Sequence, residues 1–111
     1  MNEDRLPPQN IEAEQSVLGA ILIDKDAIAK IVDIIKPVYF YRDAHKNIYD
    51  TMLKLFEKNE PIDIITVTNA LTETKLLDSV GGSYYLTQVI NSVPTSANIV
   101  HYSKIIEEKA I

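Results

Sequence analysis

The longest amphipathic stretch of the chain runs from Arg42 to Asn59. At about 100° per residue, its apolar side chains fall on one side of a helix and its charged side chains on the other. The apolar arc covers roughly half of the circumference, wider than the ~100° stripe of a helix lying on a surface. The pattern therefore predicts a central helix with neighbours on several sides and with Leu55 and Phe56 in the core. Pro61 cannot continue a helix, so the element is expected to end before it.

Five further segments show apolar residues at helical spacing, and each has the length of a short helix. They are residues 11–23, 28–35, 64–72 and 83–93, and a last segment with Ile99, Tyr102 and Ile106 as its stripe. Asn10 is a good N-cap for the first of them. Asp24 and Asp26 are candidate caps for the second. These patterns predict an all-α fold, a small orthogonal bundle of about six helices around the central one.

The segment from Pro61 to Leu76 is ambiguous. Its β-branched residues favour a strand by propensity. Against that, Asp63 is a candidate N-cap, and Ile64, Val67 and Leu71 keep helical spacing. A single strand would also find no partner elsewhere in the chain. We therefore predict that residues 64–72 are helical.

The order of these segments predicts three parts. Residues 1–10, with Pro7 and Pro8, are expected to form an extended N-terminal arm. Residues 11–93 are expected to form the globular helical domain, and residues 94–111 the last helix. No glycine or proline follows Ile99, so nothing stops that helix. Because domain boundaries normally lie in polar linkers, the chain is expected to be a piece of a longer protein.

Composition narrows the class of protein. The chain has 111 residues, of which 46% are hydrophobic, so one folded domain with one core is expected. The absence of cysteine excludes a disulfide scaffold and a thiolate zinc site. A net charge of −5 counts against direct nucleic-acid binding, which usually needs a basic surface. No run approaches the ~18 apolar residues of a membrane span.

Few residues are candidates for catalysis or for binding a ligand or metal ion. The three glycines cannot supply a phosphate-binding P-loop, and Gly19 lies on a helix side where another backbone could approach closely. Glu14 projects toward the apolar side, and we interpret it as a carboxylate satisfied by N–H groups rather than a catalytic one. His45 lies toward the apolar arc, and a hydrogen-bonded structural histidine is favoured over a metal ligand. The aromatic run from Tyr39 to Tyr41 is predicted to fill the core.

Several short motifs occur in an order that resembles one known family. They are Pro7-Pro8, IEAEQSVLG from Ile11 to Gly19, Phe40-Tyr41-Arg42 with Ala44-His45, Glu60 to Asp63, Gly81-Gly82 with Tyr85-Leu86, and Pro94 to Ile99. Together they resemble the N-terminal domain of the DnaB-type bacterial replicative DNA helicase. The resemblance covers residues 7–111 in order. Asp43 stands where the family often has proline, and both residues suit a first helical turn.

The resemblance implies a non-catalytic domain of a cytoplasmic protein. In that family ATP and Mg²⁺ are bound by a C-terminal motor domain, which translocates along DNA. The N-terminal domains pair, three pairs form a collar on the hexamer, and the collar docks the primase through the C-terminal domain of that enzyme. A helicase loader is a further candidate partner, and the last helix would lead into a helical hairpin. This fragment is therefore not expected to hydrolyse ATP or to bind DNA strongly. The alternative is a stand-alone helical adaptor that has no motor domain.

Two residues occupy positions that the resemblance implies for partner contact, Glu12 and Tyr85. Glu12 lies on the polar face of the first helix and has no evident duty in the core. Tyr85 follows the Gly81-Gly82 turn, where a ring could sit at a rim with its hydroxyl in water. The alternative is that Glu12 only favours the helix start and that Tyr85 only packs in the core.

Overall fold

The computed structural model describes residues 10–93 and 95–110, and these are helices joined by turns and short loops. The predicted arm lies outside them, apart from Asn10. The five α-helices of the described residues are α1 (Ile11–Ile23), α2 (Asp43–Glu57), α3 (Ile64–Glu73), α4 (Gly82–Asn91) and α5 (Ile99–Ala110). Two 3-10 helices, η2 (Ile28–Lys30) and η3 (Pro37–Tyr39), lie between α1 and α2. The all-α prediction is confirmed, with five α-helices where about six were expected.

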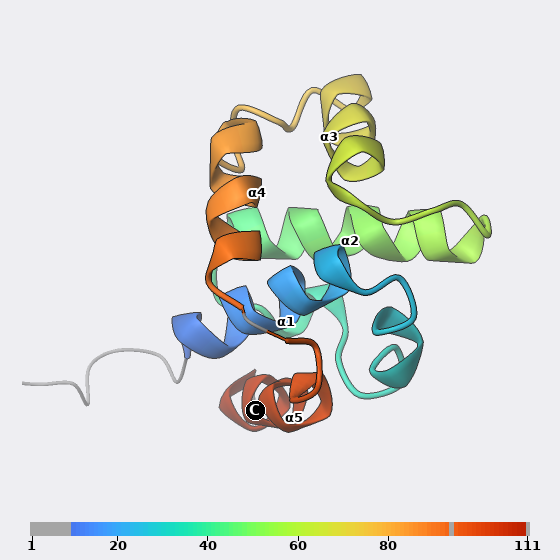
Figure 1. The fold of residues 1–111 in the computed structure, drawn as a ribbon. Coiled ribbons are helices and arrows are strands. Elements are labelled where there is room, and N and C mark those ends of the chain that lie inside the picture. The colour runs from blue at the N-terminus through green and yellow to red at the C-terminus, as the bar shows by residue number, and fades with distance from the viewer. Residues whose placement is uncertain (1–9, 94, 111) are drawn as a thin grey trace, which may run out of the picture.

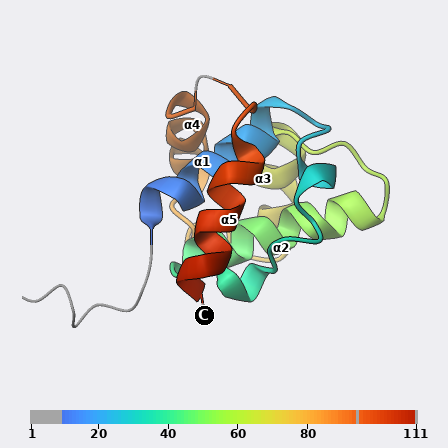
Figure 2. The same cartoon turned by 90° about the horizontal axis from the view of Figure 1, so that it is seen from below.

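Helices α3 and α4 stand steeply to α2, whereas α1 runs in roughly the same direction as α2 (Figure 1). In Figure 1, α2 lies across the middle of the molecule, with α3 and α4 on one side of it and α5 on the other. Helix α1 packs against α5, α4 and α2, so it is as central as the predicted central helix. The view from below shows α5 on the near side, and this helix also packs against η3 (Figure 2).

One hydrophobic core is shared by these elements. α1 contributes a continuous buried face from Val17 to Leu22, and α2 contributes Ile48, Tyr49 and Met52. The Tyr49 hydroxyl donates a hydrogen bond to the carbonyl of Ile35 at 3.2 Å, and burial raises the pKa of this tyrosine.

The starts of two helices follow the predicted capping chemistry. The Asn10 side chain accepts a hydrogen bond from the N–H of Ala13 at 2.9 Å. Asp63 accepts from the N–H of Thr66 at 2.9 Å, while the Thr66 hydroxyl accepts from the N–H of Asp63 at 2.9 Å. This reciprocal pair satisfies two backbone donors at the start of α3. The helical prediction for residues 64–72 is thereby confirmed despite their β-branched content.

The predicted helix over residues 28–35 is wrong. The segment forms η2 and consecutive turns, and the Asp24 carboxylate binds the N–H of Asp26 and the Ser96 hydroxyl, each at 2.9 Å. The Asp26 N–H, followed by the Ser96 hydroxyl, holds the pKa of Asp24 below its ordinary value. Ile28 and Ile31 are still fully buried. The apolar spacing therefore reports burial correctly, but tight turns deliver these side chains to the core.

Two aromatic predictions need correction. Phe40 is buried as expected, but Tyr41 is 44% exposed and Tyr39 only packs at the edge of the core. Phe56, predicted in the core, is 37% exposed, whereas its neighbour Leu55 is 8% exposed. Phe56 lies in the last turn of α2, where it lines an open surface hollow beside Ile62.

The different burial of two α2 side chains predicts different costs of truncation. Met52→Ala removes a side chain that is 0% exposed, and we expect it to lower the free energy of unfolding by about 2–5 kcal/mol. Phe56→Ala removes a ring that is partly in water, so its cost is expected to be smaller than that of Met52→Ala. Urea titrations of both variants measure the difference. An equal or larger loss for Phe56→Ala would show that this ring is a core residue after all.

Candidate functional site

The two residues predicted to contact a partner lie on neighbouring helices. Glu12 is exposed in the first turn of α1, and Tyr85 is half-buried in the first turns of α4. Gln15, one turn after Glu12, donates a hydrogen bond from Nε2 to the Tyr85 hydroxyl at 3.1 Å. The structure therefore brings Glu12, Gln15 and Tyr85 into one surface, which we call the α1–α4 surface.

Tyr85 is also the outer member of a buried hydrogen-bond chain. Its hydroxyl lies 2.6 Å from His45 Nε2, and His45 Nδ1 lies 2.7 Å from Glu14 Oε1. The second carboxylate oxygen, Glu14 Oε2, accepts from the backbone N–H of Tyr41 at 2.7 Å. Glu14 and His45 are 2% and 0% exposed. The chain links α1, the segment before α2, α2 itself and α4.

Aromatic packing holds the imidazole in place. The rings of His45 and Tyr85 are nearly parallel, with an interplanar angle of 13° and centroids 5.8 Å apart. Phe40 meets the His45 ring edge-on at a centroid distance of 6.4 Å. Offset and edge-to-face contacts of this kind fix ring orientation. The predictions of a satisfied Glu14 carboxylate and a hydrogen-bonded His45 are both confirmed, although the Glu14 donors are Tyr41 and His45.

The chain of Glu14, His45 and Tyr85 combines an acid, an imidazole and a phenol, but its geometry is that of a structural network. Both imidazole nitrogens are engaged and the ring is fully buried, so a substrate could not reach it from outside. Among the described residues, no group of three or more His, Cys, Asp or Glu side chains could hold a metal ion. The network therefore holds the Tyr85 side chain in one orientation at the α1–α4 surface.

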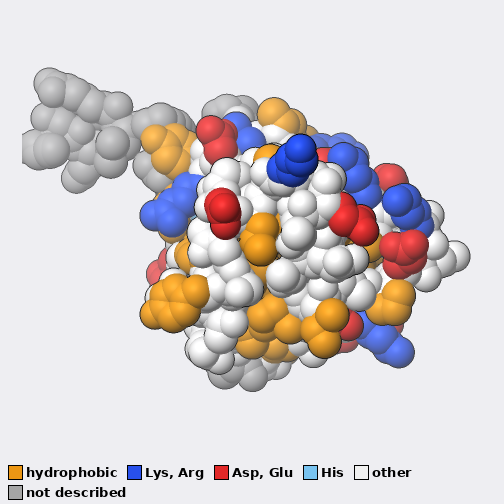
Figure 3. All heavy atoms as spheres, turned by 90° about the horizontal axis from the view of Figure 1, so that it is seen from above, with side chains coloured by type: hydrophobic (Ala, Val, Ile, Leu, Met, Phe, Trp, Pro, Cys, Tyr) orange, Lys and Arg blue, Asp and Glu red, His pale blue; other side chains and the backbone are white. Residues whose placement is uncertain are grey.

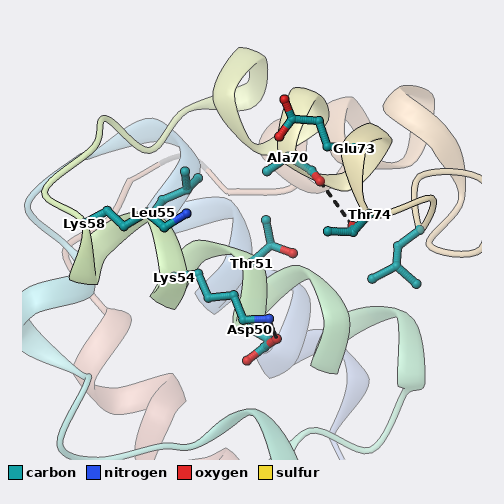
Figure 4. A pocket seen from close by; sticks show the side chains of 9 residues that line it. Asp50, Thr51, Lys54, Leu55, Lys58, Ala70, Glu73 and Thr74 are labelled. Carbon is teal, nitrogen blue, oxygen red and sulfur yellow. Dashed lines mark hydrogen bonds and ion pairs between the residues drawn. The ribbon is translucent and has the colours of Figure 1, made fainter.

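A separate cleft of about 130 Å³ lies between α2 and α3, and Figure 4 shows its lining. Lys54 pairs with Asp50 at 3.1 Å, and the Thr74 hydroxyl donates to the Ala70 carbonyl at 3.1 Å. Several polar groups of the cleft are therefore already engaged with one another. The cleft does not gather polar groups toward one point, as a small-molecule site would.

The face formed by α3 and α4 carries both signs of charge. In Figure 3, acidic and basic side chains are interspersed, and hydrophobic side chains gather in separate places. Among the residues that the structure describes, Ile65 on α3 and Tyr84 on α4 are the most exposed large hydrophobic residues, at 76% and 73%. Scattered exposure of single apolar side chains is ordinary for a folded domain and marks no interface alone.

The sequence and the fold both match known proteins. Residues 6–108 match the family model described as the DnaB-like helicase N terminal domain. The chain belongs to this family. It is 55% identical over 108 residues to the replicative DNA helicase DnaC of Bacillus subtilis, covering 97% of this chain and 24% of that protein. It is 44% identical over 108 residues to the replicative DNA helicase DnaB of Geobacillus stearothermophilus, covering 97% of this chain and 24% of that protein.

Solved structures agree with this family assignment. The N-terminal domain of DnaB helicase from Mycobacterium tuberculosis matches with a TM-score of 0.92 and 48% identity, covering 95% of this chain and 73% of that one. The structure of a DnaB-like replicative helicase, described together with its interactions with primase, matches with a TM-score of 0.81 and 31% identity. That match covers 91% of this chain and 24% of the helicase. The resemblance stated from the motifs is confirmed.

The matched region is the N-terminal domain of these helicases, and the chain spans about a quarter of the length of the first curated relatives. Within the described residues, none of the helices has the length and apolar character needed to cross a bilayer.

Proposed function

We propose that this domain is the non-catalytic assembly and docking module of a hexameric replicative helicase in the bacterial cytoplasm. Its docking partner is the C-terminal domain of primase, and its contact site is the α1–α4 surface around Glu12 and Tyr85. A helicase loader is a second candidate partner. In the full-length protein, ATP and Mg²⁺ would be bound by a motor domain reached through a helical hairpin that follows α5.

The observation that carries this proposal is the fold match to a helicase described with its interactions with primase. The surface itself adds support. Glu12 is exposed on a helix whose opposite side is buried, so its side chain is available to a partner. Tyr85 is half-buried, which suits an aromatic residue that packs on one side and meets a partner on the other.

Self-association is the second part of the proposal, because the family assembles as pairs of N-terminal domains around a ring. Sizing chromatography of this chain, with and without the primase C-terminal domain, measures both interactions in one experiment. A peak that moves to larger size on adding primase supports docking. A peak at the monomer position at all concentrations would remove self-association from the proposal for this domain.

The docking surface can be tested with single substitutions. Glu12→Ala is expected to weaken primase binding by roughly threefold to tenfold, because a charge at an interface rim changes affinity modestly. Tyr85→Phe is expected to weaken it as well. Calorimetric titration measures both, alongside a thermal melt of each sample to show that the domain is folded.

Two matched controls use residues of the same type elsewhere. Glu73→Ala removes an exposed carboxylate at the end of α3, beside the α2–α3 cleft. Tyr84→Phe removes a hydroxyl from the exposed tyrosine next to Tyr85. Both controls should bind primase as the parent chain does. If Glu12→Ala and Tyr85→Phe also bind unchanged while remaining folded, the docking site is not the α1–α4 surface.

A further inference from the structure

The buried chain behind Tyr85 has a direction that its donors and acceptors determine. A carboxylate can only accept hydrogen bonds, so His45 Nδ1, 2.7 Å from Glu14 Oε1, must carry a proton. With that one ring proton, His45 Nε2 is an acceptor. The Tyr85 hydroxyl, 2.6 Å away, then donates to it. Every polar group of the chain is satisfied in this arrangement.

The opposite arrangement turns the proton of the Tyr85 hydroxyl outward. If Nε2 carried a proton too, Tyr85 Oη would receive hydrogen bonds from both His45 and Gln15. Its own proton would then point away from the buried chain, toward solvent or a partner. Only the first arrangement gives every proton of the hydrogen-bond chain an acceptor within it, so the geometry points to a Tyr85 hydroxyl whose proton points inward.

An inward proton decides what Tyr85 offers to a partner. A hydroxyl has one proton and two lone pairs. The proton is given to His45 and one lone pair receives the Gln15 amide, so no described residue donates to the second lone pair. One turn before Gln15 on the same helix, the exposed Glu12 carboxylate also offers only acceptors. Tyr85 and Glu12 therefore contribute acceptors to the α1–α4 surface, where Gln15 keeps one amide N–H as a donor, and the protein has a net charge of −5.

We propose that Glu14 and His45 are positioning residues that fix the Tyr85 hydroxyl as an acceptor, and that the α1–α4 surface thereby binds a basic side chain of its protein partner. The partner chemistry rests on the proposed docking function, whereas the direction of the buried chain does not. A lysine or arginine side chain satisfies Glu12 and the second lone pair of Tyr85 together. A carboxylate of a partner would face the like charge of Glu12 and be disfavoured.

The direction of the chain is measured first, in the parent protein, by nitrogen NMR of the imidazole. The expected result is a neutral ring with the proton on Nδ1. In Glu14→Gln the fixed N–H of Tyr41 requires the amide oxygen, so the amide N–H₂ must face the ring. His45 should then carry its proton on Nε2 and donate to Tyr85. An unchanged tautomer in folded Glu14→Gln, or an Nε2 proton in the parent, overturns the proposal.

Primase binding is measured next as a double-mutant cycle. Glu14→Gln should weaken binding roughly threefold to tenfold, because the Tyr85 proton then points toward the partner. In the Tyr85→Phe background, Glu14→Gln should have no further effect, since it acts only through the hydroxyl. Tyr84→Phe is the control background, where the full effect should remain. Equal effects of Glu14→Gln in the Tyr85→Phe and Tyr84→Phe backgrounds would mean a general structural role and would overturn the proposal.

Salt dependence tests the basic partner. Affinity should fall as ionic strength rises from about 0.05 to 0.2 M, and Glu12→Gln should flatten that dependence. Binding that does not depend on salt would overturn the proposal that the partner contributes a basic side chain. A weakened Glu12→Ala with an unaffected Glu14→Gln overturns the positioning role and leaves the docking function standing. If Glu12→Ala and Tyr85→Phe both bind primase unchanged, the positioning role and the docking site are both overturned. The imidazole spectra still report the direction of the buried hydrogen bonds independently of binding.

Discussion

His45→Ala should lower the free energy of unfolding by about 3–5 kcal/mol, the usual cost of leaving a buried charge, here the Glu14 carboxylate, without its partner. The substitution leaves the Glu14 carboxylate 2% exposed, with the N–H of Tyr41 as its remaining donor among the bonds described. It also removes the acceptor of the Tyr85 hydroxyl and the ring that packs against Phe40. Guanidinium titration followed by circular dichroism measures the loss.

Two comparisons distinguish the loss of this hydrogen-bond network from a loss of side-chain volume alone. His101→Ala, on the exposed side of α5, should change stability by less than about 0.5 kcal/mol. Glu14→Ala should cost less in the His45→Ala background than in the parent chain, because the carboxylate has already lost its partner. Additive losses, or a loss under about 1 kcal/mol for His45→Ala, would show that the pair contributes little to stability.

The helices could be predicted where local chemistry and apolar spacing agree. At α3, the Asp63 cap and the spacing of Ile64, Val67 and Leu71 outweighed a β-branched composition, and the reciprocal Asp63–Thr66 bonds explain why. At residues 28–35 the spacing alone was misleading. Apolar residues three and four apart also suit consecutive turns, and Asp24 bonds to Asp26 and Ser96 instead of capping a helix.

The sequence predicts which side of a helix faces the core, but not how completely each side chain is buried. The helical wheel places Leu55 and Phe56 on the apolar side of α2, yet only Leu55 is buried. A wheel shows which way a side chain points, whereas coverage depends on how far the neighbouring elements extend along the helix. Phe56 lies in the last turn, beside an open hollow. Tyr41 is likewise exposed although its neighbour Phe40 is buried, because the sequence does not show where the core ends.

The sequence singled out Glu12, Glu14, His45 and Tyr85 one by one, but it did not place them in one arrangement. Glu14 and His45 are 31 positions apart, and His45 and Tyr85 are 40 apart. No local spacing rule connects such residues. The available signal was the coincidence of a carboxylate and a histidine on the apolar faces of two helices, because buried polar groups must find partners. That signal could have paired them, although only the fold shows that Tyr85 completes the chain.

Gly19→Ala should lower the free energy of unfolding by about 3 kcal/mol, the upper part of the usual range for overpacking. A Cβ at Gly19 would overlap Val93 Cγ2 and lie 2.5 Å from the carbonyl oxygen of Val89, so α1 and α4 could no longer approach as they do. The expectation of a close backbone approach at this glycine is confirmed. In an unconstrained helix the same change would stabilise by about 1 kcal/mol, so the sign alone is informative. Ser16→Ala, on the same helix, is the control and should be close to neutral. Adding Val93→Ala should recover only part of the loss, because the Val89 carbonyl is backbone and cannot rotate away.

Two outcomes would contradict this prediction. A gain in stability for Gly19→Ala in a thermal or urea titration would mean that α4 moves freely on α1. Full recovery of stability with Val93→Ala would assign the whole clash to that one side chain.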